Sequence, residues 1–245
     1  MTGALRADND RFIARPAVRL MGGFSVSGGE GLVDLPADAR RLVAFLALRR
    51  ERVPRAFIAG TLWIEGSQDR AFGNLRSALW RLGRVAGRLV DGDTQTLCLS
   101  SDATIDIDAV VQAGTQICSD DPEVSSPDCD PEIFTRELLP GWYDEWAIVE
   151  RERMRQLCLH ALEAMAGRLS MRARYAPALQ VALAAIRLDP LRESAHRCLI
   201  RIHLAEGNSS EAIRSYHEYR ERIASDLGIE PSPQLCDLLR SSDLV

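Results

Sequence analysis

The first part of the chain alternates short apolar stretches with glycine turns. Residues 17–35 read AVRLM, FSVSG and LVDL, and glycine-rich turns at 22–23 and 28–31 separate these stretches. Short apolar runs bounded by glycine predict strands joined by tight turns. The pattern therefore predicts three short strands before residue 36.

Two helices are predicted next, because the apolar spacing changes. The first begins at Ala37 and has apolar residues at i, i+3 and i+4, which indicates an amphipathic helix; these residues are Leu42, Phe45 and Leu46. Pro54 ends this segment, since proline is tolerated in a first helical turn but not in a helix interior. The stretch RAFIAGTLW (55–63) predicts a second, short helix, and the polar loop EGSQD follows it.

A third helix is predicted over residues 70–86, with one apolar face. Its apolar stripe has helical spacing and consists of Leu75, Ala78, Leu79, Leu82 and Val85. After it, RLVDGDTQTLCLS places a DGDT turn between two short alternating strands, which predicts a hairpin. Three strands, three helices and a final hairpin is the element order of a winged helix-turn-helix.

The opposite face of the third helix carries the candidate chemistry. It presents Arg70, Asn74, Arg76, Ser77, Trp80, Arg81 and Arg84. Arginine and asparagine match the edges of guanine and adenine in a major groove, and serine and further arginines suit phosphates. A basic helical face is more often simply solvated, and Trp80 could pack against the strands, so the DNA hypothesis depends on the order of elements around the helix. Asp91 and Asp93 in the predicted hairpin turn oppose it, because they would repel phosphates.

From Phe134 onward the sequence predicts successive helices and no strand. Ala178 and Ala212 lie 34 residues apart, the period of tetratricopeptide repeats. Ala182 and Ala185 continue the small positions of the first unit, whereas the second unit is degenerate. Because antiparallel helix pairs in general place small residues where helices cross, the register is a hypothesis about a tetratricopeptide-like all-α domain.

An aromatic and acidic segment opens this helical part. We interpret Trp142, Tyr143 and Trp146 as core or interdomain packing in preference to a ligand pocket. The neighbouring acidic residues are interpreted as a solvated face; they are Asp144, Glu145, Glu150 and Glu152.

Charge divides along the chain as the element pattern does. Residues 1–110 have a net charge of +2 and residues 111–245 a net charge of −7. Such an asymmetry suggests two modules with different partners. We place a winged helix-turn-helix at 17–104 and a helical domain at 105–240, an α+β domain followed by an all-α one. The stretch 119–132, rich in Pro, Ser and Asp, is predicted to be an exposed loop.

Composition narrows the class further. The 245 residues are 46% hydrophobic and 27% charged, as in globular proteins, and no apolar run reaches the ~20 residues of a membrane span. The start has no apolar signal region, so we expect a cytoplasmic, nucleoid-associated protein without a membrane. Six scattered cysteines predict reduced thiols, and the four histidines lack metal-ligand spacing. We expect no cofactor, no metal and no enzymatic activity, because no catalytic or phosphate-binding motif is present.

Several of these segments together resemble one family of regulators. The segments RLMGGFSVSG, LPADARRLVAFLALRRERVPR, AGTLW and NLRSALWRL are similar to the OmpR-type winged helix of SARP (Streptomyces antibiotic regulatory protein) regulators, and LLPGWYDEWAIVERERMRQL, LDPLRESAHRCLIRIHLAEGN and LGIEPSPQL resemble the bacterial transcriptional activation domain that follows it. No phosphate-loop motif is present, so the resemblance is to a short form of the family.

The resemblance implies a function for each part. In the family the third helix enters the major groove, which carries a groove-facing role onto Asn74, Arg76, Ser77, Trp80, Arg81 and Arg84. It implies an activator of a biosynthetic gene cluster that binds direct repeats in double-stranded promoter DNA, as a dimer at least on DNA, and recruits RNA polymerase. The alternative is a peptide- or protein-binding tetratricopeptide scaffold whose winged helix no longer reads DNA.

Overall fold

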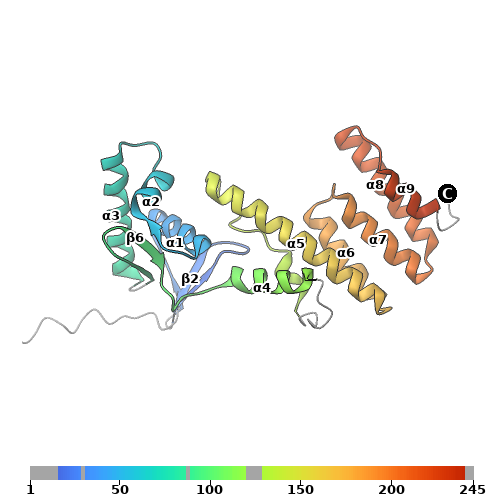
Figure 1. Cartoon of the computed structure of the whole chain (residues 1–245), viewed down its shortest axis with the longest axis horizontal. Coiled ribbons are helices and arrows are strands. Elements are labelled where there is room, and N and C mark those ends of the chain that lie inside the picture. The colour runs from blue at the N-terminus through green and yellow to red at the C-terminus, as the bar shows by residue number, and fades with distance from the viewer. Residues whose placement is uncertain (1–15, 29–30, 87–88, 120–128, 241–245) are drawn as a thin grey trace, which may run out of the picture. The chain divides into compact units, whose positions relative to one another are not determined.

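The computed structural model describes residues 16–28, 31–86, 89–119 and 129–240. They form two compact units (Figure 1). The winged-helix unit comprises residues 1–109 together with 137–152, and the helical unit comprises 110–136 together with 153–245.

The residues of these units do not divide at the predicted boundary between residues 104 and 105. Residues 137–152 follow the first helix of the second part in sequence, yet they pack with the winged helix. The reason is apolar burial: Leu138 and Leu139 are fully buried there, and Trp146 is almost fully buried. The pattern along the chain indicated where helices begin, but not which unit covers their apolar residues.

The winged-helix unit contains two small sheets. The first has the order β3-β2-β1-β7, in which β1 is antiparallel to β2 and parallel to β7. The second has the order β4-β6-β5 and is antiparallel throughout. The strands are β1 (Ala17–Arg19), β2 (Ser25–Gly28), β3 (Gly31–Val33), β4 (Val53–Pro54), β5 (Val90–Gly92), β6 (Thr96–Leu99) and β7 (Thr104–Ile105).

The three helices predicted in the first part are present. They are α1 (Ala37–Arg49), α2 (Arg55–Leu62) and α3 (Gln68–Val85). Leu42, Phe45 and Leu46 of α1 are buried, as their spacing predicted. The three predicted strands and the hairpin are also present. Residues 29 and 30 of the predicted glycine turn, and Arg88 at the predicted start of the hairpin, lie outside the described residues.

No strand follows Phe134 among the described residues, as expected, but one isolated bridge does. Leu138 forms an isolated antiparallel bridge with Met21. The amide of Leu139 donates to the carbonyl oxygen of Leu20 at 2.9 Å, and that of Gly22 donates to the carbonyl oxygen of Glu137 at 2.7 Å. The segment therefore extends the backbone pairing of β1 beyond the strand's end. No alternating pattern marks it, because only a few residues take part.

The helical unit is built from successive helices. α6, α7 and α8 pack pairwise in chain order, as the orange and red ribbons of Figure 1 show. The elements are α4 (Asp106–Cys118), the 3-10 turn η1 (Pro131–Phe134), α5 (Glu145–Met171), α6 (Tyr175–Leu188), α7 (Glu193–Glu206), α8 (Ser209–Leu227) and α9 (Pro233–Arg240). The first residues of α4 and α5 belong to the winged-helix unit. Of the predicted loop 119–132, residues 120–128 lie outside the described residues, and its end belongs to η1.

The helix starts agree with a 34-residue period. α6 begins at Tyr175 and α8 at Ser209, which is 34 residues later. Ala178, Ala182 and Ala212 are fully buried, as residues at close helix crossings must be. The tetratricopeptide assignment itself stays a prediction.

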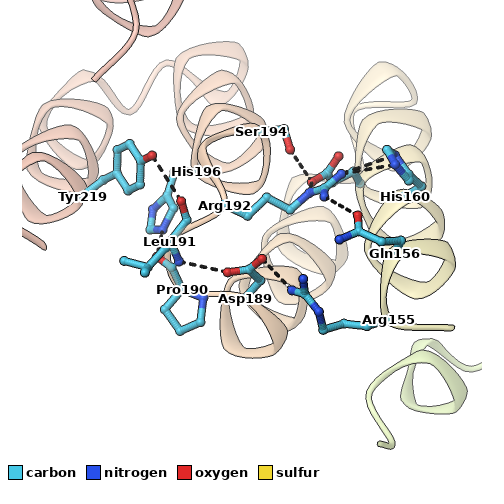
Figure 2. A network of polar contacts seen from close by, with 11 residues as sticks. Arg155, Gln156, His160, Asp189, Pro190, Leu191, Arg192, Ser194, His196 and Tyr219 are labelled. Atoms are coloured by element: carbon cyan, nitrogen blue, oxygen red, sulfur yellow. Dashed lines mark hydrogen bonds and ion pairs between the residues drawn. The ribbon is translucent and has the colours of Figure 1, made fainter. Parts of the chain in front are cut away.

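A polar network holds the helices of this unit together (Figure 2). Nε of Arg192 lies 2.6 Å from Oε1 of Glu163, which also accepts from the hydroxyl of Ser194 at 2.7 Å. Arg155 of α5 pairs with Asp189, which follows α6, at 2.6 Å. These contacts join α5 to the ends of α6 and α7. Among the described residues, no helix is both long and apolar enough to cross a membrane.

Candidate nucleic-acid interface

Helix α3 is held in place by one buried face and a capped start. The hydroxyl of Ser67 accepts a hydrogen bond from the amide of Arg70, which satisfies one of the free amides of the first turn. The buried residues of the helix follow a 4-3-4 spacing, and they are Ala71, Leu75, Ala78 and Leu82. Because this stripe fixes the rotation of the helix, it also fixes which side chains face solvent.

Two residues of the predicted apolar stripe are not buried. Leu79 is only half-buried, and Val85 has 44% of its surface exposed. Val85 is the last residue of the helix, where the final turn extends beyond the core. At the start of the helix, Ala71 joins the buried stripe, because the helix begins at Gln68, two residues earlier than expected.

The residues assigned to the groove lie on one side of α3, and all but one are exposed. Asn74 is half-buried, whereas Arg76, Ser77, Trp80, Arg81 and Arg84 are exposed. At 100° per residue, Arg70 falls between Ser77 and Arg81 on this same face. Arg70 is exposed as well, and no ion pair joins it to another described residue. The family resemblance did not include it, although the spacing alone places it there.

Arg81 is held by an acidic partner from another helix. Its guanidinium lies 2.9 Å from Oδ2 of Asp38 in the first turn of α1. Both side chains are partly exposed, so solvent screens the pair and its contribution to stability is small. The contact instead sets the direction of the arginine. Sequence spacing could not reveal it, because the two residues are 43 positions apart.

Trp80 is exposed and does not pack against the strands. It has 63% of its surface exposed, and the guanidinium of Arg84 lies 4.9 Å from the centre of its ring. A cation at this distance over a tryptophan face is attracted by the ring. The hypothesis that Trp80 packs against the strands is therefore wrong. Trp80 and Arg84 form one exposed surface of mixed apolar and cationic character.

Ser77 and Asn74 are less available for contact with DNA than the exposed arginines are. The hydroxyl of Ser77 donates to the carbonyl oxygen of Gly73 at 3.0 Å, so its proton is used within the helix. Asn74 lines a hollow of about 910 Å³ within the winged-helix unit, together with Arg41, Arg70 and Trp146. Asn74 thus lies at the edge of the exposed face.

The acidic residue in the hairpin turn has a local structural role. The carboxylate of Asp93 accepts hydrogen bonds from the amides of Thr96 and Gln95, both at 2.8 Å, and lies 2.8 Å from the guanidinium of Arg52. These bonds, the backbone ones first, hold the pKa of Asp93 well below its usual range. Of the two negative charges that oppose DNA binding, that of Asp93 is therefore paired and orders the hairpin, whereas Asp91 is exposed.

Close approach of the two strands explains the glycine in this hairpin. A Cβ atom on Gly92 would lie 2.4 Å from the carbonyl oxygen of Thr96. No side chain fits there without moving the backbone. Arg55, at the start of α2, donates from Nε to the carbonyl oxygen of Asp93 at 2.8 Å. Two arginines, Arg52 and Arg55, thus lie beside the hairpin turn.

Packing was predicted for three aromatic residues around the start of α5, and two of them, Trp142 and Trp146, do pack. The ring of Trp146 lies 5.4 Å from that of Phe45, edge to face, and Trp142 lies 5.7 Å from Phe24. Tyr143 has 83% of its surface exposed and takes no part. The interpretation of Asp144 as merely solvated is wrong, because its carboxylate pairs with Arg41 of α1.

The described residues offer no alternative centre for metal chemistry. Within them, no group of three or more His, Cys, Asp or Glu side chains could hold a metal ion. No disulfide joins any of the six cysteines, all of which lie in the described ranges. The arrangement of α3 and the hairpin is instead suited to contacting a polyanion.

Comparisons with known proteins agree with this architecture. Residues 134–241 match the model of the bacterial transcriptional activator domain. Among solved structures, Mycobacterium tuberculosis EmbR, in complex with a low affinity phosphopeptide, is similar, with a TM-score of 0.67 and 19% sequence identity over 92% of this chain. The chain spans 64% of the length of that protein. At this identity the likeness shows a shared fold. A search of curated proteins gave no match.

The fold defines a class: a winged helix whose chain continues into a helical activator domain. The match over residues 134–241 confirms the part of the family resemblance that concerns the activation domain. The chain carries a bacterial transcriptional activator domain over residues 134–241.

Proposed function

We propose that this protein is a sequence-specific transcriptional activator whose helix α3 reads promoter DNA in the major groove. The observation that carries the proposal is the exposed face of α3, where four arginines flank an exposed tryptophan on a helix fixed by a buried stripe. Arginine is the side chain that most often reads guanine, through two parallel hydrogen bonds. The residues proposed to contact DNA are Asn74, Arg76, Ser77, Trp80, Arg81 and Arg84, and Arg70 joins them.

The contacts divide into two kinds. Arg76 has no ion pair among the described residues, and Arg81 is oriented by Asp38, so these two are suited to base edges. Arg52 and Arg55 beside the hairpin turn are suited to phosphates, which position a protein on DNA without reading sequence. Ser77 would need to rotate its hydroxyl away from Gly73 before it could donate to a phosphate.

The activator domain supplies the second half of the proposal. In this account residues 134–241 contact RNA polymerase, and two protomers bind side by side on a direct repeat. Recognition helices of paired protomers meet the same face of DNA when the repeats are about 10–11 base pairs apart, which is one helical turn. The target is proposed to be the promoter of a biosynthetic gene cluster.

The direct test is footprinting of the full chain on the promoter regions next to its own gene, combined with transcription by purified RNA polymerase. We expect protection of two repeats spaced by one helical turn, and increased transcription from that promoter. Protection without increased transcription would contradict the activator role. Absence of any sequence-specific protection would contradict the reading role of α3 and favour the protein-binding scaffold instead.

A further inference from the structure

The helical unit contains a basic cavity that the proposed function does not use. The cavity measures about 330 Å³ and lies between the end of α5, the start of α6 and η1. A cavity of this size is at the lower end of the range that holds small ligands. Three of its lining residues are arginines: Arg168, Arg172 and Arg174. Its described lining residues include no Asp or Glu.

The positive charge at this cavity contrasts with its surroundings. Residues 111–245 have a net charge of −7, so an anion would meet repulsion over most of this part of the chain. Arg172 and Arg174 form no ion pair with any described residue, and both are exposed. Arg168 donates to the carbonyl oxygen of Ser119 at 2.8 Å, a contact that orients the guanidinium, and no carboxylate of a described residue forms an ion pair with it.

The turn between α5 and α6 places two of these arginines. Ala173 lies between them with a φ of 55°, in the left-handed region that glycine normally occupies. The amide of Arg174 donates to the carbonyl oxygen of Leu169 at 3.0 Å, which closes the turn. Strained residues persist where the surrounding structure requires their conformation, and such sites are often binding sites. Here the strained turn brings Arg172 and Arg174 to the same cavity.

The start of α6 adds to the attraction for an anion. The helix has 14 residues, no side chain caps its first turn, and no acidic residue lies there. Free amides at a helix start carry a partial positive charge and bind anions. Pro177 and Gln180, near this helix start, also line the cavity.

The remaining wall of the cavity is apolar. Met165, Leu169 and Val181 line the cavity together with the arginines. An inorganic ion would leave these side chains without a contact. A ligand with both an anionic head and a small apolar body would match both kinds of wall.

We propose that this cavity binds a small organic phosphate, with the phosphate held by Arg168, Arg172 and Arg174 and the apolar body against Met165 and Val181. Arginine is suited to phosphate because its planar fork donates two parallel hydrogen bonds. A phosphate head carries close to two negative charges at pH 7, which matches the cluster better than a single carboxylate does.

Calorimetric titration of the full chain with phenyl phosphate tests the proposal. We expect saturable binding of phenyl phosphate, at least tenfold weaker binding of inorganic phosphate and of benzoate, and no binding of phenol. Equal binding of phenyl phosphate and inorganic phosphate would contradict the role of the apolar wall, and equal binding of benzoate would contradict the phosphate head. No binding of phenyl phosphate would overturn the site.

Variants separate the site from a general effect of charge. The double variant Arg172→Ala/Arg174→Ala should lose at least tenfold in affinity for phenyl phosphate. The matched control is Arg187→Ala/Arg201→Ala, which removes two exposed arginines of α6 and α7 and should bind as the unaltered chain does. Equal losses in both double variants would contradict the proposal.

A charge reversal keeps the test valid if the double variant unfolds. Arg174→Glu changes one exposed side chain and should abolish binding while the thermal unfolding transition is retained. Unchanged binding by a folded Arg174→Glu chain would overturn the assignment. All of these variants alter the helical unit, and no titration contains DNA. The outcomes are therefore independent of whether α3 reads promoters.

Discussion

At the scale of single residues, Asp38 determines how Arg81 is presented. The two side chains pair at 2.9 Å between α1 and the face of α3 that we propose to contact DNA. The carboxylate of Asp38 orients Arg81, and its negative charge repels the phosphates of DNA. This repulsion weakens binding to DNA of any sequence. Asp38 is therefore proposed to favour specific over non-specific binding.

This role gives a prediction for Asp38→Asn. The variant should bind DNA of random sequence more tightly, because Arg81 is released and one negative charge is lost. The dependence of binding on salt should steepen by about one unit, the value for one more phosphate contact. Fluorescence anisotropy titrations at several salt concentrations measure both quantities.

Asp69→Asn is the matched control, since it removes one exposed charge from the start of α3 but no partner of Arg81. If both variants increase non-specific binding equally, the effect is general charge and the orienting role of Asp38 is wrong.

His196 gives a second prediction at this scale, concerning pH. Its side chain is buried, stacks on Tyr219 with ring centres 4.3 Å apart, and bonds through Nε2 to the carbonyl oxygen of Pro190 (Figure 2). Burial lowers the pKa of His196 below its ordinary value of 6.5, although the bond to Pro190 acts in the opposite direction. The unfolded chain therefore binds a proton that the folded chain does not. Stability is full above about pH 6.5 and falls as the pH drops below that value.

We expect the unfolding temperature of the full chain to fall between pH 7 and pH 5, and this fall to be reduced in His196→Gln. Circular dichroism melts at several pH values measure it. His217→Gln, at an exposed position on α8, is the control and should keep the full pH dependence. An equal fall in all three proteins would show that His196 is not responsible.

At the scale of elements, the order of strands and helices could be predicted from the sequence, whereas contacts between distant residues could not. Leu42, Phe45 and Leu46 indicated α1 because helical periodicity is a local property. The pairing of Leu138 with Met21 leaves no local pattern, since one bridge involves too few residues. The burial of α3 was predicted for Leu75, Ala78 and Leu82 but not for Ala71, because the start of a helix is hard to place to within one turn.

The same limit applies to the candidate site. Its exposed arginines could be predicted, because the apolar stripe leaves only one face of α3 free. The partner of Arg81 and the hydrogen bonds of Asp93 could not, because they depend on how α1 and the hairpin fold against other elements.

Close packing of α6 leads to a prediction for Ala178. This residue is fully buried, and α6 packs on α7. Ala178→Leu should overpack the helix crossing and lower the free energy of unfolding by about 1–3 kcal/mol. Ala176→Leu, at an exposed position of the same helix, should change it by less than about 0.5 kcal/mol. Denaturant unfolding measures both, and equal stability of the two variants would contradict the proposed repeat register.

At the scale of the whole molecule, the winged-helix unit depends on a segment that comes later in the chain. Residues 137–152 supply Trp142 and Trp146, which pack on Phe24 and Phe45. The stretch also contains Asp144, the partner of Arg41. A fragment that ends at residue 110 would expose this aromatic surface.

We therefore predict that a fragment of residues 1–110 is less stable than a fragment of residues 1–152. The loss should be at least the ~3–5 kcal/mol that truncation of a single buried Trp to Ala costs, because two tryptophans are removed. Thermal and denaturant unfolding of the two fragments give the comparison. Equal midpoints would mean that residues 137–152 do not stabilise the winged helix.

The measurement that tests the central claim most directly is a binding titration of the Asn74→Ala/Arg76→Ala/Arg81→Ala variant against the unaltered chain. Each is titrated onto the footprinted promoter site and onto a scrambled DNA of the same length, at one salt concentration. We predict that the variant loses at least the ~1–3 kcal/mol of one base contact on the promoter site and less on the scrambled DNA, with its thermal unfolding unchanged. Full specific binding by the folded variant would show that α3 does not read the promoter.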